Sequence, residues 1–138
     1  MKQGRSYKFA NECAAEALRE SKVGGAAVLE VLQKLPFPAN TRRQNVIPVG
    51  VPSVFSQCAG LTTSKGRVPT LSRLVNRSPA VVELLARFMA KENAASNYAF
   101  TSITVNYNYA SKAHRDNSHV DGQARIIALG EYEGGELW

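Results

Sequence analysis

Long hydrophobic runs are absent from this 138-residue sequence. No stretch approaches the roughly 20 consecutive apolar residues that a membrane-spanning helix needs, so the sequence predicts no span. The basic first residues, 1–8, are followed by no apolar stretch, which argues against a secretory signal peptide. We therefore expect an intracellular protein, cytoplasmic or nuclear, with no membrane partner.

Cysteine is scarce, because Cys13 and Cys58 are the only two. They are too few for a disulfide framework, and neither has a second cysteine at metal-ligand spacing. Apolar residues make up 44% of the chain and charged residues 20%, which is close to the average for folded soluble proteins and argues against intrinsic disorder. The length leaves room for one domain.

Basic residues exceed acidic ones, giving a formal net charge of +6. The excess lies in residues 1–100, which hold 14 Lys and Arg against 6 Asp and Glu, whereas residues 101–138 hold 3 against 5. The densest basic group, which has no aromatic residues between its members, is Lys65, Arg67, Arg73 and Arg77. Such a surface can bind nucleic acid or another polyanion, but an ordinary solvated surface is the simpler explanation.

The first half of the chain is predicted to be mainly helical. Residues 9–34 have a helical pattern that the Gly24-Gly25 pair is expected to interrupt, because glycine is costly inside a helix. Residues 36–70 predict a long connection with one or two short strands. A clearer helix follows, with Ser78 as N-cap and Pro79 in the first turn. Its apolar stripe at helical spacing predicts core packing and comprises Val81, Val82, Leu84, Leu85, Phe88 and Met89.

The last third of the chain changes to the period of a β-strand. Residues 100–109 alternate, with an apolar face that includes Ile103 and Val105 and a polar face that includes Asn106 and Asn108. The last four positions of residues 124–129 are apolar on both faces, which predicts a central strand, and a third strand is expected to begin at residue 136. Helices followed by strands predict an α+β fold.

Both histidines lie in one short segment, and each is followed two positions later by an aspartate, as His114-x-Asp116 and His119-x-Asp121. In an extended segment these paired side chains point to the same side. Two histidines and one carboxylate on one face of the ion form the facial triad of non-haem Fe(II) oxygenases. The spacing alone favours two histidines in an exposed turn, because such pairs arise by chance.

The surroundings of the histidines resemble those in Fe(II)/2-oxoglutarate-dependent dioxygenases. The matching parts occur in the family's order: a strand at 100–110, then His114-Arg115-Asp116-Asn117, then a buried strand from Ile126, then Gly134-Gly135-Glu136-Leu137-Trp138. The resemblance covers residues 100–138 well and residues 58–99 loosely. It implies N-terminal helices packed on a partial double-stranded β-helix, or jelly-roll, with residues 58–138 as the first part of the dioxygenase domain and residues 1–57 as a helical and irregular region before it.

The resemblance also implies roles for four residues and two small molecules besides iron. His114 and Asp116 would be Fe(II) ligands, and Asn106 and Asn108 would contact the cosubstrate 2-oxoglutarate, with oxygen as the second cosubstrate. The alternative ligand pair, His119 and Asp121, fits the alternation but leaves a shorter run to the strand at Ile126.

Two parts of the family's site have no counterpart in the sequence. No histidine follows His119, and the arginine that would pair with the far carboxylate of 2-oxoglutarate is missing. We therefore expect a fragment that is inactive by itself. Two other hypotheses remain: a non-catalytic, degenerate oxygenase-like module that binds nucleic acid or another polyanion through its basic face, and an unrelated basic α+β binding protein.

Overall fold

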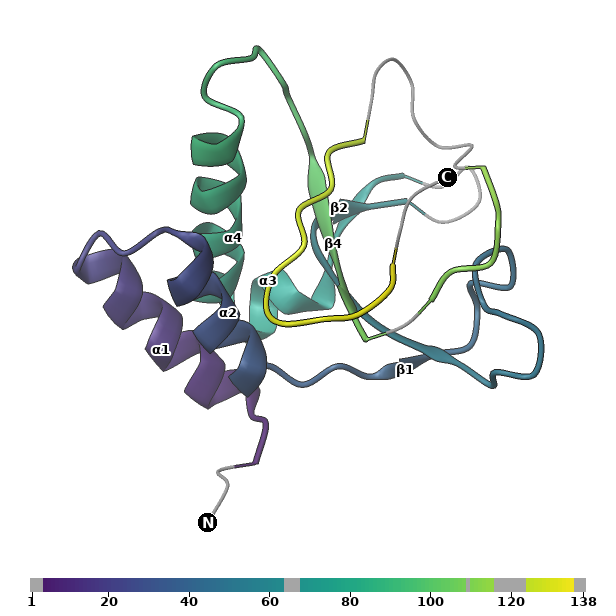
Figure 1. Ribbon diagram of the computed structural model, residues 1–138. Coiled ribbons are helices and arrows are strands. Elements are labelled where there is room, and N and C mark those ends of the chain that lie inside the picture. Colours follow the sequence, from purple (N-terminus) through teal and green to yellow (C-terminus); the bar gives the residue numbers. More distant parts are fainter. Residues whose placement is uncertain (1–3, 64–67, 109, 116–123, 136–138) are drawn as a thin grey trace.

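The computed structural model describes residues 4–63, 68–108, 110–115 and 124–135, and within these ranges the protein combines helices with one small antiparallel sheet (Figure 1). The elements are α1 (Tyr7–Arg19), α2 (Gly25–Lys34), β1 (Ala39–Asn40), β2 (Val54–Thr62), β3 (Thr70–Leu71), α3 (Arg73–Arg77), α4 (Pro79–Glu92) and β4 (Ser102–Tyr107). The expected mixture of helix and sheet is confirmed.

The helical layer consists of α1, α2 and α4, and α1 packs against the other two. The predicted helical region is interrupted, as expected, close to the glycine pair. α1 ends at Arg19, and α2 begins at Gly25 with Gly24 as its N-cap residue. Small residues of α1 allow close packing, and larger ones from α2 and α4 fill the core. The fully or nearly fully buried members include Ala10, Ala14, Val28, Val31, Leu84 and Phe88.

The start of α4 is tied to α1. Ser78 is the N-cap residue as predicted, but its hydroxyl donates to the Tyr7 carbonyl at 2.9 Å and does not cap its own helix. The side-chain oxygen of Asn11 instead accepts a hydrogen bond of 2.8 Å from the Ala80 backbone N–H. A first-turn N–H, which has no partner within its helix, is thereby satisfied from α1. The apolar stripe of α4 faces the core as predicted.

The sheet is built around β2, which pairs antiparallel with β1, β3 and β4. The nine-residue length of β2 was not expected, since the sequence predicted only short strands in this region. The helices cover one face of the sheet (Figure 1), where Ala59 of β2 and Ile103 and Val105 of β4 pack against the core. The predicted alternation of β4 is therefore confirmed over Ser102–Tyr107.

The prediction of a central strand at residues 124–129 is wrong. The segment has no strand structure, and Ile126 and Ile127 are 69% and 38% exposed. It runs beside the helices instead, where Leu129 packs on the core and lies against Gly25 of α2 (Figure 1). A strand that is apolar on both faces needs a neighbouring strand, and it needs other elements to cover both of its faces. In the described part of the chain, residues 124–129 pair with no strand and are not covered on both faces. The strand expected from residue 136 lies outside the described residues.

Residues on both sides of the expected division at residue 57 share one hydrophobic core. Val28 and Val31 precede the division and Leu84 and Phe88 follow it, and β2 runs across it. Among the described residues, no helix is long and apolar enough to cross a membrane.

Candidate functional site

The sheet face that points away from the helices is polar. Because side chains alternate along a strand, the packing of Ala59 and Ile103 against the helices directs their strand neighbours to the opposite face. The antiparallel register places Ser56 opposite Asn106 and Cys58 opposite Thr104 on this face. We call these four residues the polar face.

The loop of residues 41–47 lies beside the polar face. The Arg43 carbonyl accepts hydrogen bonds of 3.0 Å from the backbone N–H groups of Val46 and Ile47, and both of these residues are buried. The Arg43 side chain lies 3.5 Å from the Asn106 side-chain oxygen, to which it donates a long hydrogen bond. The loop thus brings a guanidinium to a strand that lies 63 positions later in the sequence.

The same loop positions the segment that carries His114. The Lys112 backbone N–H donates to the Val46 carbonyl at 2.9 Å, and the Lys112 carbonyl lies 2.8 Å from Nδ1 of His114. A carbonyl accepts only, so Nδ1 carries the proton and Nε2 of a neutral imidazole is the acceptor nitrogen. Histidine ligands of metal ions usually hold their second ring nitrogen in this way. The imidazole therefore fits a metal ligand that would bind through Nε2.

The other predicted ligands cannot be compared with His114. Asp116 lies outside the described residues, as do His119 and Asp121. Within the described ranges, no group of three His, Cys, Asp or Glu side chains is close enough to hold a metal ion. The described residues thus supply one oriented imidazole of the expected iron site.

The two asparagines predicted to contact the cosubstrate differ in position. Asn106 lies on the polar face within β4. Asn108 lies beyond the end of the strand and has a φ of +43°, in the left-handed region. The strand alternation on which the pairing of Asn106 and Asn108 was based therefore stops before Asn108.

An open cavity of about 550 Å³ adjoins the polar face. Its lining residues come from three parts of the chain: Arg43 from the loop, Cys58, Leu61, Thr62, Thr63 and Pro69 from β2 and the segment after it, and Thr101, Ser102 and Thr104 from the start of β4. The volume lies within the range of small-molecule sites, roughly 300–1,000 Å³.

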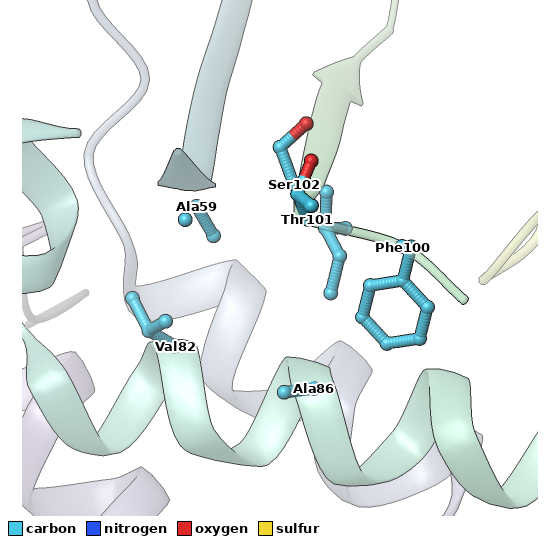
Figure 2. A pocket seen from close by; sticks show the side chains of 8 residues that line it. Ala59, Val82, Ala86, Phe100, Thr101 and Ser102 are labelled. Atoms are coloured by element: carbon cyan, nitrogen blue, oxygen red, sulfur yellow. The ribbon is translucent and has the colours of Figure 1, made fainter. Parts of the chain in front are cut away.

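A second cavity, of about 190 Å³, lies on the helix side of the sheet and is mostly apolar (Figure 2). Val82 and Ala86 of α4 form one wall, and Ala59, Phe100 and Thr101 lie opposite them (Figure 2). It is smaller than most ligand sites, and none of its lining residues in the described part of the chain is charged, so they offer little to orient a ligand.

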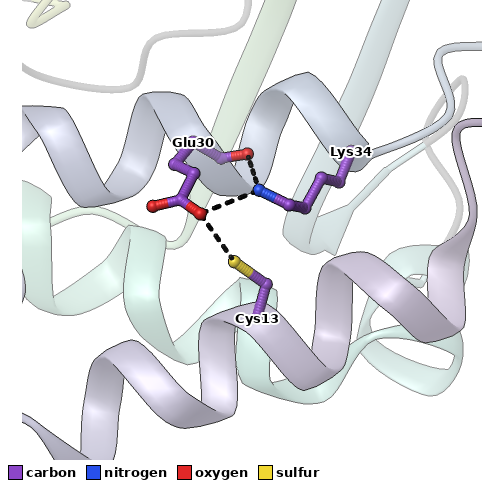
Figure 3. Close-up of polar contacts among 3 residues, drawn as sticks. All are labelled: Cys13, Glu30 and Lys34. Atoms are coloured by element: carbon purple, nitrogen blue, oxygen red, sulfur yellow. Dashed lines mark hydrogen bonds and ion pairs between the residues drawn. The ribbon is translucent and has the colours of Figure 1, made fainter. Parts of the chain in front are cut away.

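Both cysteines are free thiols that are poorly suited to nucleophilic chemistry. Burial raises the pKa of Cys58, although its hydrogen bond with Thr104 and the charge of Arg43 act in the opposite direction. Burial also raises the pKa of Cys13, whose sulfur lies 3.9 Å from the Glu30 carboxylate that pairs with Lys34 (Figure 3). A reactive cysteine needs a lowered pKa, so neither thiol fits a catalytic nucleophile.

The sequence did not single out Arg43 or the polar face of β2. Their region has the pattern of an irregular connection, and the sole local sign of a cationic site is the Arg42-Arg43 pair. No protein-family model matches the chain, and neither a curated protein nor a solved structure matches it.

Proposed function

We propose that this chain forms part of an Fe(II)- and 2-oxoglutarate-dependent dioxygenase. The observation that carries the proposal is the orientation of His114. This histidine follows β4, the strand that bears Asn106, and its Nδ1 is held by the Lys112 carbonyl at 2.8 Å. In that arrangement Nε2 is the acceptor nitrogen, as it is in a metal-binding imidazole.

The sheet supports the same proposal through its architecture. A double-stranded β-helix needs an antiparallel sheet with one face covered and a polar face toward the site. The open sheet around β2 has helices on one face and Ser56, Cys58, Thr104 and Asn106 on the other. In this proposal the second half of the jelly-roll would cover Ile126 and Ile127, which are exposed here.

The proposal gives each residue a defined task. His114 and Asp116 would hold Fe(II), and Asn106 and Asn108 would hydrogen-bond 2-oxoglutarate. The bound iron and cosubstrate would supply the oxidation of a substrate C–H bond by oxygen. The protein's own contribution would be to hold the imidazole in one tautomer and to orient the cosubstrate from β4.

Cobalt(II) binding to the purified chain tests the first ligand, because Co²⁺ accepts the same imidazole and carboxylate donors and is stable in air. We expect visible absorption bands to develop on titration with Co²⁺. His114→Ala should weaken the affinity by at least about tenfold, since one of two protein ligands is lost. His119→Ala, the matched control, should leave it unchanged.

The opposite pattern would exclude the assignment. If His119→Ala weakens Co²⁺ binding and His114→Ala does not, the ligand pair is His119 and Asp121. If the wild-type chain binds no Co²⁺, the iron site proposed here is wrong. Nucleic-acid binding with a steep salt dependence, in the absence of any metal binding, would favour the polyanion-binding module instead.

The proposal also requires a second histidine ligand, and an arginine for the far carboxylate of 2-oxoglutarate. It predicts that the transcript continues past the codon for Trp138 into strands that carry a histidine and then an arginine. A stop codon directly after Trp138 would contradict the enzyme and favour the binding module.

A further inference from the structure

The polar side chains that line the cavity at the polar face can all donate hydrogen bonds. Its polar lining consists of hydroxyl groups from Thr62, Thr63, Thr101, Ser102 and Thr104, together with the guanidinium of Arg43 and the thiol of Cys58. Among the described residues, none that lines the cavity is an aspartate or a glutamate. Hydroxyls and guanidinium N–H groups donate hydrogen bonds, so the cavity offers donors and a positive charge.

Arg43 is held in place at this cavity. Its carbonyl is engaged by Val46 and Ile47 in a turn, and its side chain reaches Asn106 across the polar face. The guanidinium has five N–H donors, so the bond to Asn106 is compatible with binding a further acceptor. Arg43 is half-buried, whereas the adjacent Arg42 is exposed and does not line the cavity.

The neighbouring thiol adds no competing negative charge. Burial raises the pKa of Cys58, so the sulfur is protonated at neutral pH. No thiolate at Cys58 therefore neutralises the Arg43 charge.

We propose that this cavity binds the oxyanion group of a small organic ligand, a carboxylate or a phosphate ester, with Arg43 as its anchor. The planar guanidinium can bind two oxygens of either group at once, and the Thr104 and Ser102 hydroxyls supply further donors. About 550 Å³ leaves room for the body of the ligand beyond its charged group. This site does not depend on metal binding at His114.

Calorimetric titration of the metal-free 138-residue chain tests the site. The probes are succinate and inorganic phosphate, each titrated at constant ionic strength so that general screening does not change. We expect saturable binding of at least one probe, and the stronger one identifies a carboxylate or a phosphate as the ligand group. Arg43→Gln should weaken that binding by about tenfold or more, because it removes a charge-assisted hydrogen-bond donor.

Arg42→Gln is the matched control, since it removes the same charge one position earlier, on an exposed side chain. It should leave the affinity unchanged. Equal weakening by Arg42→Gln and Arg43→Gln would show a diffuse electrostatic effect and overturn the proposal. So would the absence of saturable binding of both probes to the wild-type chain.

Thr104→Val keeps the test decisive if Arg43→Gln does not fold. Thr104 is exposed on β4, and its replacement leaves the loop of residues 41–47 intact. We expect it to weaken binding several-fold, and an unchanged affinity would overturn the proposed cavity. Loss of Co²⁺ binding in His114→Ala with unchanged succinate or phosphate binding would separate this site from the iron site.

Discussion

Among the described glycines, Gly60 is the one where an added Cβ atom would meet the backbone most closely. It lies in β2 with a φ of +103°, and a Cβ atom there would meet the Thr101 carbonyl oxygen directly and lie 3.1 Å from the Ser102 Cα. The backbone cannot move away easily, because the Leu61 N–H donates to that same Thr101 carbonyl and the Gly60 carbonyl accepts from Ser72.

Gly60→Ala should therefore carry two costs. An L-residue in a left-handed conformation loses about 1–2 kcal/mol, and forcing an extra methyl group into a packed site costs about 1–3 kcal/mol. Together they lower the free energy of unfolding by about 2–5 kcal/mol. For a chain of this size, each kcal/mol corresponds to roughly 3–5 °C in the melting temperature.

Gly50→Ala is the matched control, because Gly50 also has a positive φ, of +81°, but no atom lies within 4 Å of the place that a Cβ would occupy. It should lose only the conformational cost, about 1–2 kcal/mol. Urea unfolding followed by circular dichroism measures both variants. If Gly60→Ala and Gly50→Ala lose the same stability, the close approach of β2 to the start of β4 adds nothing to the cost of the Gly60 substitution, and the reasoning fails.

Two further predictions concern the contact between α1 and α4 and the thiol at the polar face. Asn11→Ala should lower the free energy of unfolding by about 1 kcal/mol, because the Ala80 N–H loses its acceptor. Asn11→Asp should restore the lost stability, since its carboxylate can accept the same hydrogen bond near the start of α4. Equal losses of stability in the two variants would refute the capping role of Asn11. In the Cys13→Ser variant only Cys58 can be alkylated, and the pH midpoint of its alkylation rate should be higher in the folded protein than in concentrated urea. The reason is that burial raises the Cys58 pKa in the folded state. A folded-state midpoint at or below the midpoint in urea would contradict this.

The sequence predicted well those elements in which residues at a regular spacing all face the same surroundings. The stripe of α4 has helical spacing because all of it faces the core, and β4 alternates because one side packs on helices and the other does not. β2 lacks such a pattern. Gln57 lies on its core-facing side and is satisfied there by the Tyr7 hydroxyl at 2.9 Å and the Pro36 carbonyl at 2.8 Å. A half-buried polar residue with tertiary partners interrupts the alternation that identifies a strand.

The wrong expectation at residues 124–129 has a different cause. A short apolar run indicates burial but does not specify what covers it. In the structure only Leu129 reaches the core, through α2, and Ile126 is mostly exposed. The surroundings of such a segment depend on its neighbours in space, which a local pattern cannot specify.

The candidate site extends over more of the chain than its motif does. The His-x-Asp pair and the family resemblance lie in residues 100–138, yet the ring of His114 is oriented by Lys112, whose N–H is held by Val46. The turn that holds Val46 is closed on the carbonyl of Arg43, the residue that reaches Asn106. Changes within residues 41–47 should therefore alter both the imidazole and the polar face, although no motif marks that loop. The N-terminal half of the chain is thus a structural component of the site, because it supplies the backbone on which the histidine segment rests.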